Sequence, residues 1–521
     1  MRVLLVNPPY PFEESPTPPF GLISLAAYLI EQGAEVRIED YIVTPYSADR
    51  ARRVIGEFRP DVIGATAVTM NVKPALSILA DCKEAAPGAV TVMGGPHVTF
   101  DADAVLREYA HVDYIVRGEG ELTFHEMLSL VEAGRPLDGV LGISYRDGGV
   151  VRHNPMRPFI EDINMLPYPA RQLISLGKYR ALGFPINMVT SRGCPHKCIF
   201  CVGNRMVGNK VRYFDVTRVV DEFELLATMG FKQINIVDDL FTSHKRRCIE
   251  ICDEIVRRGI RHPWTAFARV DTVSEDLLAA LKRAGCTTLC FGIESGNQEI
   301  LDLVKKKITL EKARRAVELC RAAGIDPMTS YILGLPGETP ETVRKTMEFA
   351  KGLSSNYGFH ILAPFPGTEV REKSDEYGMR ILTSDWDLYD ANRSVAETEF
   401  ISHEEIDRIV NEFNGGLRRI VIDMLASRDR GETLPPQHAQ MVQSLVNFLF
   451  ARDLIVNELV ENYNGAGNGC DRDAILAGFA AHVSGAIGMP ETDVRAHLER
   501  LVGANCIAVC GSGSGNSLAW N

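Results

Sequence analysis

The sequence predicts an α/β protein with three parts: a doubly wound parallel sheet, a partial (βα)6 barrel and a helical C-terminal region with a small winged-helix-like unit. Three observations predict it. Short apolar runs alternate with helical patterns over residues 1–145. The same alternation resumes at residue 185, after a proline-rich stretch, and its first strand leads into a dense group of cysteines. Beyond residue 370, long helical patterns dominate.

Composition sets the outer limits of function. The chain has 521 residues, enough for two to four domains, with 45% hydrophobic and 24% charged residues. Its net charge of −12 argues against nucleic acid as the main partner. No apolar run reaches the about 18 residues of a membrane span. Residues 1–6 enter a strand pattern at once, unlike a signal peptide. The 12 cysteines therefore suit the reducing cytoplasm, in metal sites or the core.

The first domain, residues 1–145, reads as a parallel sheet because its strands alternate with helices at short spacing. Ligands bind such sheets at the C-terminal ends of the strands. The expected strands are Arg2–Val6, Glu35–Ile38, Val62–Ala67, Val90–Met93 and Tyr114–Val116, and the expected helices include Gly21–Gln32, Pro74–Ala85 and Ala104–Tyr109.

The loops at those strand ends are rich in glycine and proline. Glycine there lets the backbone approach a large ligand closely. The loop after the first strand contains no histidine. We expect ligand contacts from Asn7, Pro8, Pro9, Pro19, Gly21, Thr66, Val68, Thr69, Gly94, Gly95, Pro96, His97, Gly118 and Glu119.

Residues 146–184 read as a linker, because Asn154-Pro155, Arg157-Pro158 and Leu166–Pro169 break any regular pattern. Residues 185–370 then form the barrel, with six βα units favoured over a full eight-stranded barrel. The expected strands are 186–190, 232–237, 263–268, 287–293, 327–333 and 357–362, and the helices include Val216–Met229, Lys245–Arg258, Glu275–Ala284, Leu310–Ala323 and Glu341–Lys351.

The cysteines follow the first barrel strand as Cys194, Cys198 and Cys201, with the spacing C-x3-C-x2-C. Three thiolates on a [4Fe–4S] cluster leave one iron free for another ligand. Zinc is the alternative, but zinc favours paired C-x2-C halves, and no second half lies nearby. The loop sits at the strand end where α/β barrels keep their chemistry. The pairs Cys248/Cys252 and Cys286/Cys290 read as small core residues.

The cysteine run, with Phe200 before the third cysteine, resembles the signature of the radical S-adenosylmethionine (SAM) enzymes. The resemblance implies that the three cysteines hold the cluster, whose free iron binds SAM, and that SAM cleavage gives a 5′-deoxyadenosyl radical. Polar or glycine residues end the later barrel strands, all on one face. By resemblance, Phe200 lies beside the adenine, and the further SAM-side contacts are Asp238, Arg269 at the SAM carboxylate, Glu294 at the ribose, Ser295, Gly334 and Leu335.

The first-domain loops, in this order before the cysteine run, resemble the cobalamin-binding domain of B12-dependent radical SAM enzymes. One departure matters: the first loop lacks the Asp-x-His-x-x-Gly motif that supplies a histidine to cobalt. The resemblance therefore implies cobalamin bound with its own base displaced and no histidine on the lower face. His97 follows the fourth strand, where it suits the nucleotide tail, or is a turn histidine satisfied by backbone.

Together these resemblances imply a cytoplasmic enzyme that methylates an unactivated carbon through methylcobalamin and the 5′-deoxyadenosyl radical. They imply a small-molecule or carrier-bound substrate and an electron donor such as flavodoxin or ferredoxin. The layout also looks like the anaerobic Mg-protoporphyrin monomethyl ester cyclase, which performs oxidation and ring closure. A methylthiotransferase would need a second three-cysteine set, and a corrinoid carrier would not need the cysteine run.

The C-terminal part divides into a helical region, residues 371–465, and a small unit, residues 466–521, that resembles a winged helix. That unit has three arginines and five acidic residues, so no DNA-binding face is expected. A substrate cap, a carrier dock or a dimer contact fits better. Expected here are helices at His403–Arg428, Gln437–Tyr463, Asp473–Ile487 and Glu491–Val502, a linker at Asn464–Gly469, a strand at Ile507–Cys510 and a mobile tail at 511–517.

Overall fold

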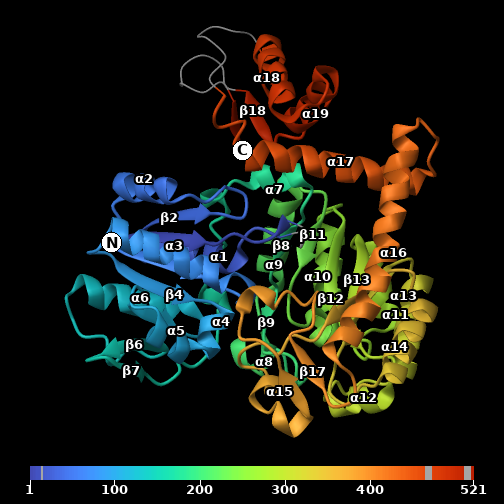
Figure 1. Cartoon of the computed structure of the whole chain (residues 1–521), viewed down its shortest axis with the longest axis horizontal. Coiled ribbons are helices and arrows are strands. Elements are labelled where there is room, and N and C mark those ends of the chain that lie inside the picture. Colours follow the sequence, from blue (N-terminus) through green and yellow to red (C-terminus); the bar gives the residue numbers. More distant parts are fainter. Residues whose placement is uncertain (13–15, 464–471, 510–517) are drawn as a thin grey trace.

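The computed structural model describes residues 1–12, 16–463, 472–509 and 518–521. Two sheets lie side by side, with the blue first sheet next to the green and yellow barrel, and the red C-terminal unit sits beyond α17 (Figure 1). None of the helices in these ranges is long and apolar enough to cross a membrane.

The first sheet has seven strands in the order β2-β1-β3-β4-β5-β6-β7. The first five in this order pair in parallel, as predicted. The last two are antiparallel, so the sheet is mixed, and its edge strand β7 lies within the predicted linker. The strands are β1 (Arg2–Asn7), β2 (Glu35–Asp40), β3 (Val62–Thr66), β4 (Val90–Gly94), β5 (Tyr114–Val116), β6 (Ile143–Asp147) and β7 (Val150–His153).

Helices cover both faces of this sheet, which makes it doubly wound. One apolar core joins the sheet to α1 and α6, and a second joins its other face to α2, α3, α4 and α5. Because both faces are covered, β1 is a continuous buried apolar run. The helices are α1 (Phe20–Glu31), α2 (Ala48–Phe58), α3 (Val72–Ala85), α4 (Pro96–Phe100), α5 (Ala102–Glu108) and α6 (Gly120–Glu132).

The barrel is an open sheet of six parallel strands in the order β15-β14-β13-β12-β11-β8. The six-stranded prediction is therefore correct, and the eight-stranded alternative is not. The strands are β8 (Ile186–Met188), β11 (Ile234–Ile236), β12 (Trp264–Ala268), β13 (Cys286–Glu294), β14 (Asp326–Leu333) and β15 (Tyr357–Ile361).

Helices cover the outer face of the barrel sheet. Trp264, Phe291 and Tyr331 are fully buried there in one core shared with the helices. The barrel helices are α9 (Val216–Thr228), α10 (Lys245–Arg257), α11 (Glu275–Arg283), α12 (Gln298–Leu303), α13 (Leu310–Ala322) and α14 (Pro340–Leu353). Shorter pieces around the barrel are β9 (Ser191–Arg192), α8 (Gly203–Met206), β10 (Arg212–Tyr213), α15 (Glu369–Glu372), β16 (Met379–Ile381) and β17 (Ala396–Thr398).

The segment predicted as a linker contains a buried helix, α7 (Leu176–Leu182). The hydroxyl of Tyr179 donates to Asp40 Oδ2 at 2.7 Å, and Asn7 Nδ2 donates to Asp40 Oδ1 at 2.8 Å. Burial raises the pKa of Asp40. Because all three side chains are buried, this contact fixes the first sheet against the segment that enters the barrel.

The C-terminal region packs on the barrel through α17 and α7. Its small unit shares the barrel's main core, where Phe450 of α17 stacks on His497 of α19 with ring centroids 4.7 Å apart. The predicted linker 464–469 and tail 511–517 lie outside the described residues. The elements are α16 (His403–Asp429), α17 (Pro436–Val456), α18 (Arg472–Ile487), α19 (Glu491–Gly503) and the antiparallel pair β18 (Ile507–Val509) and β19 (Leu518–Trp520).

Candidate functional site

The cysteine loop starts where β8 ends, and Asp238 holds its first turn. The carboxylate of Asp238 accepts bonds of 2.6 Å from the Thr190 amide, the Thr190 hydroxyl and the Ser191 hydroxyl. Burial raises the pKa of this carboxyl, while those bonds act to lower it. Asp238 is 2% exposed and both its oxygens are used, so it positions the loop. A contact between Asp238 and a cofactor stays a prediction.

The three thiols present themselves at the outer side of this loop. Cys194 and Cys198 are half-buried and Cys201 is exposed. Burial raises the pKa of the half-buried Cys194 and Cys198 thiols, whereas Lys306 and Arg269 act to lower the pKa of Cys198. A cluster iron or another cation would be needed to hold all three as thiolates at neutral pH.

Their spacing favours a cluster over a single metal ion. Among the described residues, three ligand atoms within 4.8 Å of one another occur together only in Glu397, His403 and Glu404. At least two of the three sulfurs therefore lie more than 4.8 Å apart. Each sulfur of a cluster site binds a different iron, so wider spacing suits it.

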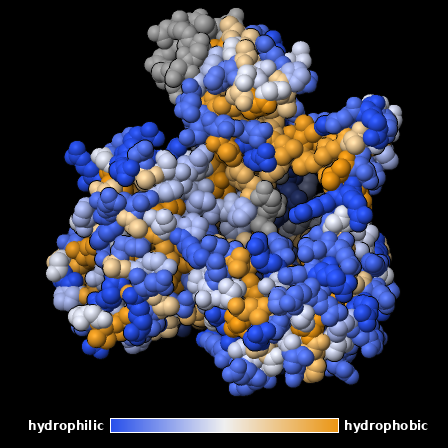
Figure 2. All heavy atoms as spheres, in the orientation of Figure 1, coloured by the Kyte–Doolittle hydropathy of each residue, from blue (hydrophilic) through white to orange (hydrophobic). Residues whose placement is uncertain are grey.

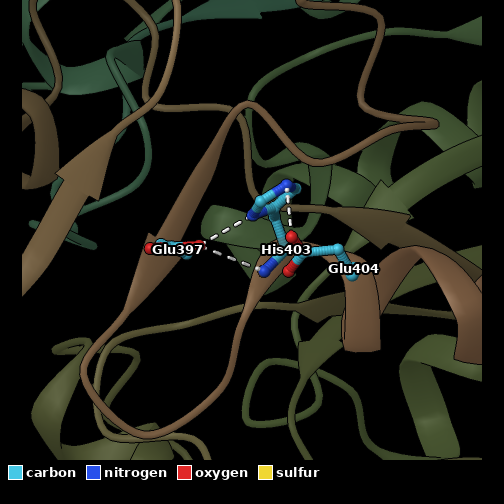
Figure 3. A group of neighbouring side chains, drawn as sticks. All are labelled: Glu397, His403 and Glu404. Atoms are coloured by element: carbon cyan, nitrogen blue, oxygen red, sulfur yellow. Dashed lines mark hydrogen bonds and ion pairs between the residues drawn. The ribbon is translucent and has the colours of Figure 1, made fainter.

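In that group, Glu397 lies on β17, and His403 and Glu404 are the first two residues of α16 (Figure 3). His403 Nδ1 lies 2.7 Å from Glu397 Oε2, and His403 Nε2 lies 3.2 Å from Glu404. Arg380 Nε also donates to Glu397 at 3.0 Å. A guanidinium already neutralises this carboxylate, so the group reads as an ion-pair network around the helix start.

A buried ion pair lies beside the cysteine loop. Lys306 Nζ donates to Glu294 Oε1 at 2.6 Å, and the two side chains are 10% and 9% exposed. Lys306 also lies 5.9 Å from the centre of the Phe200 ring. Glu294 has a φ of 76°, which is unusual for a residue with a side chain. Lys306 is a site residue that sequence reasoning missed, because its partner is 12 positions away.

Arg269 is held nearby by a bidentate contact with Asp271, at 3.0 and 3.1 Å, and donates to the Lys306 carbonyl at 3.0 Å. Arg269 and Lys306 thus lie near the thiols, and each is paired with a carboxylate. A guanidinium and an ammonium group are the donors that suit an anionic ligand group, as a SAM carboxylate would be.

The other residues predicted on the SAM side, Ser295, Gly334 and Leu335, take part in hydrogen bonds that involve backbone amides. Ser295 is fully buried, lies 3.2 Å from the Thr346 hydroxyl and accepts from the Asn297 amide at 3.1 Å. The amides of Gly334 and Leu335 donate to Glu338 at 2.8 and 3.1 Å. Glu338 is fully buried, and burial raises its pKa to about 8.

A cavity of about 380 Å³ joins the first sheet to the barrel. Its inner part runs between the sheet and the helices α1 and α6, along Leu5, Gly64 and Phe124. A Cβ on Gly64 would lie 3.1 Å from Leu5 and 3.6 Å from Phe124, so glycine keeps this channel open. Its outer part reaches Arg192 and Asp239 beside the cysteine loop.

About half of the predicted ligand residues of the first domain line this cavity. They are Gly21, Thr66, Gly94, Gly95, Pro96, Gly118 and Glu119. The others, Asn7, Pro8, Pro9, Pro19, Val68, Thr69 and His97, are absent from its lining. Gly95 has a φ of 99°, and a Cβ there would lie 2.7 Å from the Ala67 carbonyl. Glycine is therefore required at this close approach of two strand-end loops. The apolar channel residues were missed because they read as ordinary core.

His97 is buried beside the cavity's rim. Its Nδ1 lies 3.2 Å from the Thr69 hydroxyl, its Nε2 lies 3.5 Å from Asp101, and its ring meets Trp386 edge-on at 4.9 Å. All three contacts are with side chains, so they do not match a turn histidine satisfied by backbone, and a contact with the nucleotide tail stays a prediction.

Glu119 joins the two halves at the cavity. It accepts from Arg192 at 3.0 Å, from Arg212 at 2.9 and 3.0 Å, and from the Ile160 amide at 2.8 Å. Glu121 accepts from Arg192 at 2.7 Å. Burial acts to raise the pKa of Glu119, but the two arginines and the amide bring it below its usual value. The loop after β5 of the first sheet is therefore ion-paired to β9, the strand that leads into the cysteine loop.

Comparisons with known proteins agree with this geometry. The model of the Radical SAM superfamily matches residues 188–350, and that of the B12 binding domain matches residues 14–128. An uncharacterized methyltransferase of Pyrococcus horikoshii is 37% identical over 79% of this chain and 91% of its own length. The anaerobic magnesium-protoporphyrin IX monomethyl ester cyclase of Rubrivivax gelatinosus is 31% identical over 79% of this chain and 77% of its own.

The chain belongs to the cobalamin-dependent radical SAM enzymes.

The fold is that of solved family structures. TsrM from Kitasatospora setae, a radical SAM methyltransferase solved with cobalamin and a [4Fe-4S] cluster, superposes with a TM-score of 0.65 and 20% identity, over 96% of this chain and 98% of its own. OxsB with aqua-cobalamin bound gives a TM-score of 0.70 and 18% identity, over 96% and 79%. Membership of the family gives this chain three cofactors: a [4Fe–4S] cluster, SAM and cobalamin.

Proposed function

We propose that this enzyme transfers a methyl group to an unactivated carbon. The observation that carries the proposal is the cavity, because it joins the strand-end loops of the cobalamin domain to the cysteine loop of the barrel. In this family, SAM supplies both the methyl group and the 5′-deoxyadenosyl radical, and cobalamin carries the methyl group. The relatives include methyltransferases, among them the hopanoid C-3 methylase of Methylococcus capsulatus, 26% identical.

The chain's own residues fit these groups. Cys194, Cys198 and Cys201 would ligate three irons of the cluster. Arg269 and the Glu294–Lys306 pair would orient SAM, because they place fixed charges near the cluster cysteines. The glycine-lined channel beside Gly64 would take the nucleotide tail of cobalamin, which supports binding with the base displaced from cobalt.

The first test needs no substrate. The holoenzyme, reconstituted without oxygen, is reduced and given SAM that carries a deuterated methyl group. We expect labelled methyl on the extracted cobalamin, and 5′-deoxyadenosine in solution, both seen by mass spectrometry. Candidate substrates should then gain one labelled methyl group. If cobalamin stays unlabelled while 5′-deoxyadenosine accumulates, methyl transfer is not the reaction.

Cyclase-type chemistry is the second candidate, because the Rubrivivax gelatinosus cyclase shares 31% identity over most of its length. It predicts a product that has lost hydrogen or gained oxygen, with no labelled methyl. The label therefore separates the two functions in one experiment.

The partners follow from the chemistry. Reduction of the cluster needs a one-electron donor of the flavodoxin or ferredoxin kind, and the substrate is a small molecule, free or on a carrier. Unpaired cysteines such as Cys201, exposed at the loop, suit the reducing cytoplasm. The unit built from α18, α19 and the β18–β19 pair resembles a winged helix, and its fusion to the barrel core suits a supporting role better than DNA binding.

A further inference from the structure

The inner face of the barrel sheet carries a row of apolar side chains. Strand register places Phe267 beside Cys290 and Cys290 beside Met328. On the other side of Phe267, the residues that follow the paired Ile236 and Met188 are Val237 and Val189. These five residues, which we call the apolar row, cross five neighbouring strands of the sheet. At about 4.8 Å per strand, the row spans about 19 Å.

The row lies on the face away from the helices. Its strand neighbours Ala266, Leu289 and Phe291 are buried in the core that the outer helices share. Side chains alternate between faces along a strand, so the row faces the barrel interior. There Phe267 is 50% exposed and Met328 is 38% exposed, although β12 and β14 are internal strands. The described chain therefore leaves the middle of the row partly uncovered.

Polarity changes sharply above and below this row. Thr265 lies two residues before Phe267 on β12, on the same face of the sheet. Its hydroxyl donates to Asn235 Oδ1 at 2.7 Å, so the side chains on this side of the apolar row are polar. Two residues closer to the strand ends, Arg269 begins the charged site beside the thiols. Two members of the apolar row, Val189 and Val237, line the interdomain cavity. The apolar row thus runs from the cavity across the inner face of the sheet. It lies two residues before the charged residues along the strands.

Space also opens on this side of the molecule. Figure 2 shows a hollow below α17 and beside α16, with hydrophobic surface along its α17 border. The far edge of the sheet is bounded by α16, where Phe413 meets Phe359 of β15 with ring centroids 5.0 Å apart.

We infer that the apolar row holds the hydrocarbon skeleton of the substrate, so that the substrate is a lipid-class molecule. The inference rests on the proposed function, because it assumes that the cavity is where the substrate carbon reacts. Contact with water raises the free energy of exposed apolar side chains in the middle of a parallel sheet. An apolar ligand that covers them removes this unfavourable free energy. A substrate recognised mainly by polar groups would leave the row uncovered.

The test uses the fluorescent C18 polyene cis-parinaric acid as the probe and the reconstituted holoenzyme. Wild type should bind the probe, and 1-octanol, 1-decanol and 1-dodecanol should each displace it. The affinity of the alkanol should rise about two- to four-fold for each added methylene group. Phe267→Asp and Met328→Asp should each weaken probe binding at least about ten-fold, because a carboxylate in the row must be desolvated. Both positions are partly exposed, so these variants should fold.

The matched control is Leu225→Asp, the same kind of change at a 51%-exposed apolar residue of α9, which covers the outer face of the barrel sheet. It should leave probe affinity unchanged. Iron and cobalt contents confirm that each variant is folded and loaded. Equal loss of probe binding in Leu225→Asp, or no dependence on alkanol length, overturns the inference. Probe binding that fails only in the row variants, in an enzyme that never labels its cobalamin, keeps the inference while the methyl-transfer proposal fails.

Discussion

Arg192 Nη1 and Glu119 Oε1 lie 3.0 Å apart, and this contact joins the cobalamin domain to the strand that leads into the cysteine loop. Arg192 is 15% exposed and Glu119 is 8% exposed, so both charges depend on each other for solvation. The position of the cobalamin domain relative to the cysteine loop therefore depends on an ion-pair network. Several measurements can test the roles of the residues in this network and in the site.

Replacing Arg192 should loosen the two halves. Arg192→Ala leaves Glu119 with Arg212 and the Ile160 amide, and leaves Glu121 with no guanidinium. Loss of a buried partner costs about 3 kcal/mol. We expect a lower urea midpoint for the holoenzyme. Arg315→Ala is the control, because its pair with Glu275 is largely exposed and is worth less than about 1 kcal/mol. Equal midpoints for the two variants would contradict a structural role for Arg192.

Each cluster cysteine should be essential for SAM cleavage. Cys194→Ala, Cys198→Ala and Cys201→Ala each remove a thiolate that an iron needs. We expect loss of bound iron and of 5′-deoxyadenosine, while cobalamin binding persists in the other domain. Cys320→Ala, at a buried thiol of α13, should keep its iron. A cluster-loop variant that makes 5′-deoxyadenosine at the wild-type rate would refute the assignment.

The pair Glu294–Lys306 should set SAM affinity. Glu294→Gln and Arg269→Ala each remove a charged hydrogen-bonding group, which should weaken SAM binding by about ten- to a hundred-fold at unchanged iron content. Glu369→Gln is a matched control, because Glu369 pairs with Lys305 at the same 2.6 Å but is more exposed. Isothermal titration with SAM measures all three, and unchanged affinity in Glu294→Gln would remove this residue from the site.

Glu338 should make stability depend on pH. Its pKa is raised from 4.5 to about 8 by burial, so between these values the folded state keeps a proton that the unfolded state releases. Its contribution to stability is full below the unfolded pKa and falls as pH rises toward about 8. Glu338→Gln should lose this slope in urea midpoints measured across that window.

The control for that slope is Glu341→Gln, an exposed carboxylate in the first turn of α14, which begins two residues after Glu338. Its midpoints should run parallel to those of wild type. A Glu338→Gln curve that also runs parallel would show that this carboxyl does not hold its proton in the folded state.

Cobalt should carry no histidine from His97. The ring already contacts Thr69, Asp101 and Trp386, and the first-strand loop offers no imidazole. The cob(II) form should show no nitrogen splitting in its electron paramagnetic resonance spectrum, in wild type or in His97→Ala. Splitting that disappears in His97→Ala would make His97 the ligand, and splitting that survives there would indicate the cofactor's own base or another histidine.

The sequence predicted most strands because buried parallel strands are continuous apolar runs, as Leu289–Ile293 illustrates. It could have predicted the β6–β7 hairpin, since Gly148-Gly149 is a two-residue turn signal between strand patterns. The cysteines were readable because their spacing is local. Lys306 and Arg212 were not, because their partners are set by tertiary contacts with Glu294 and Glu119. For the same reason, the sequence did not predict the bonds of Asp238 to Thr190 and Ser191 or the bond of Ser295 to the Asn297 amide, and their contacts with a ligand stay predictions.

The buried bond from Tyr179 to Asp40, together with the grip of Glu119 on two barrel arginines, means that the two halves are not interchangeable modules. A cobalamin domain grafted from a relative would need more than a matching corrin pocket. It would have to bring acceptors for Arg192 and Arg212 and a buried carboxylate for Tyr179, or the chimera would bury three unpaired donors. The contacts between the two domains therefore restrict the exchange of domains between such enzymes more than cofactor binding does.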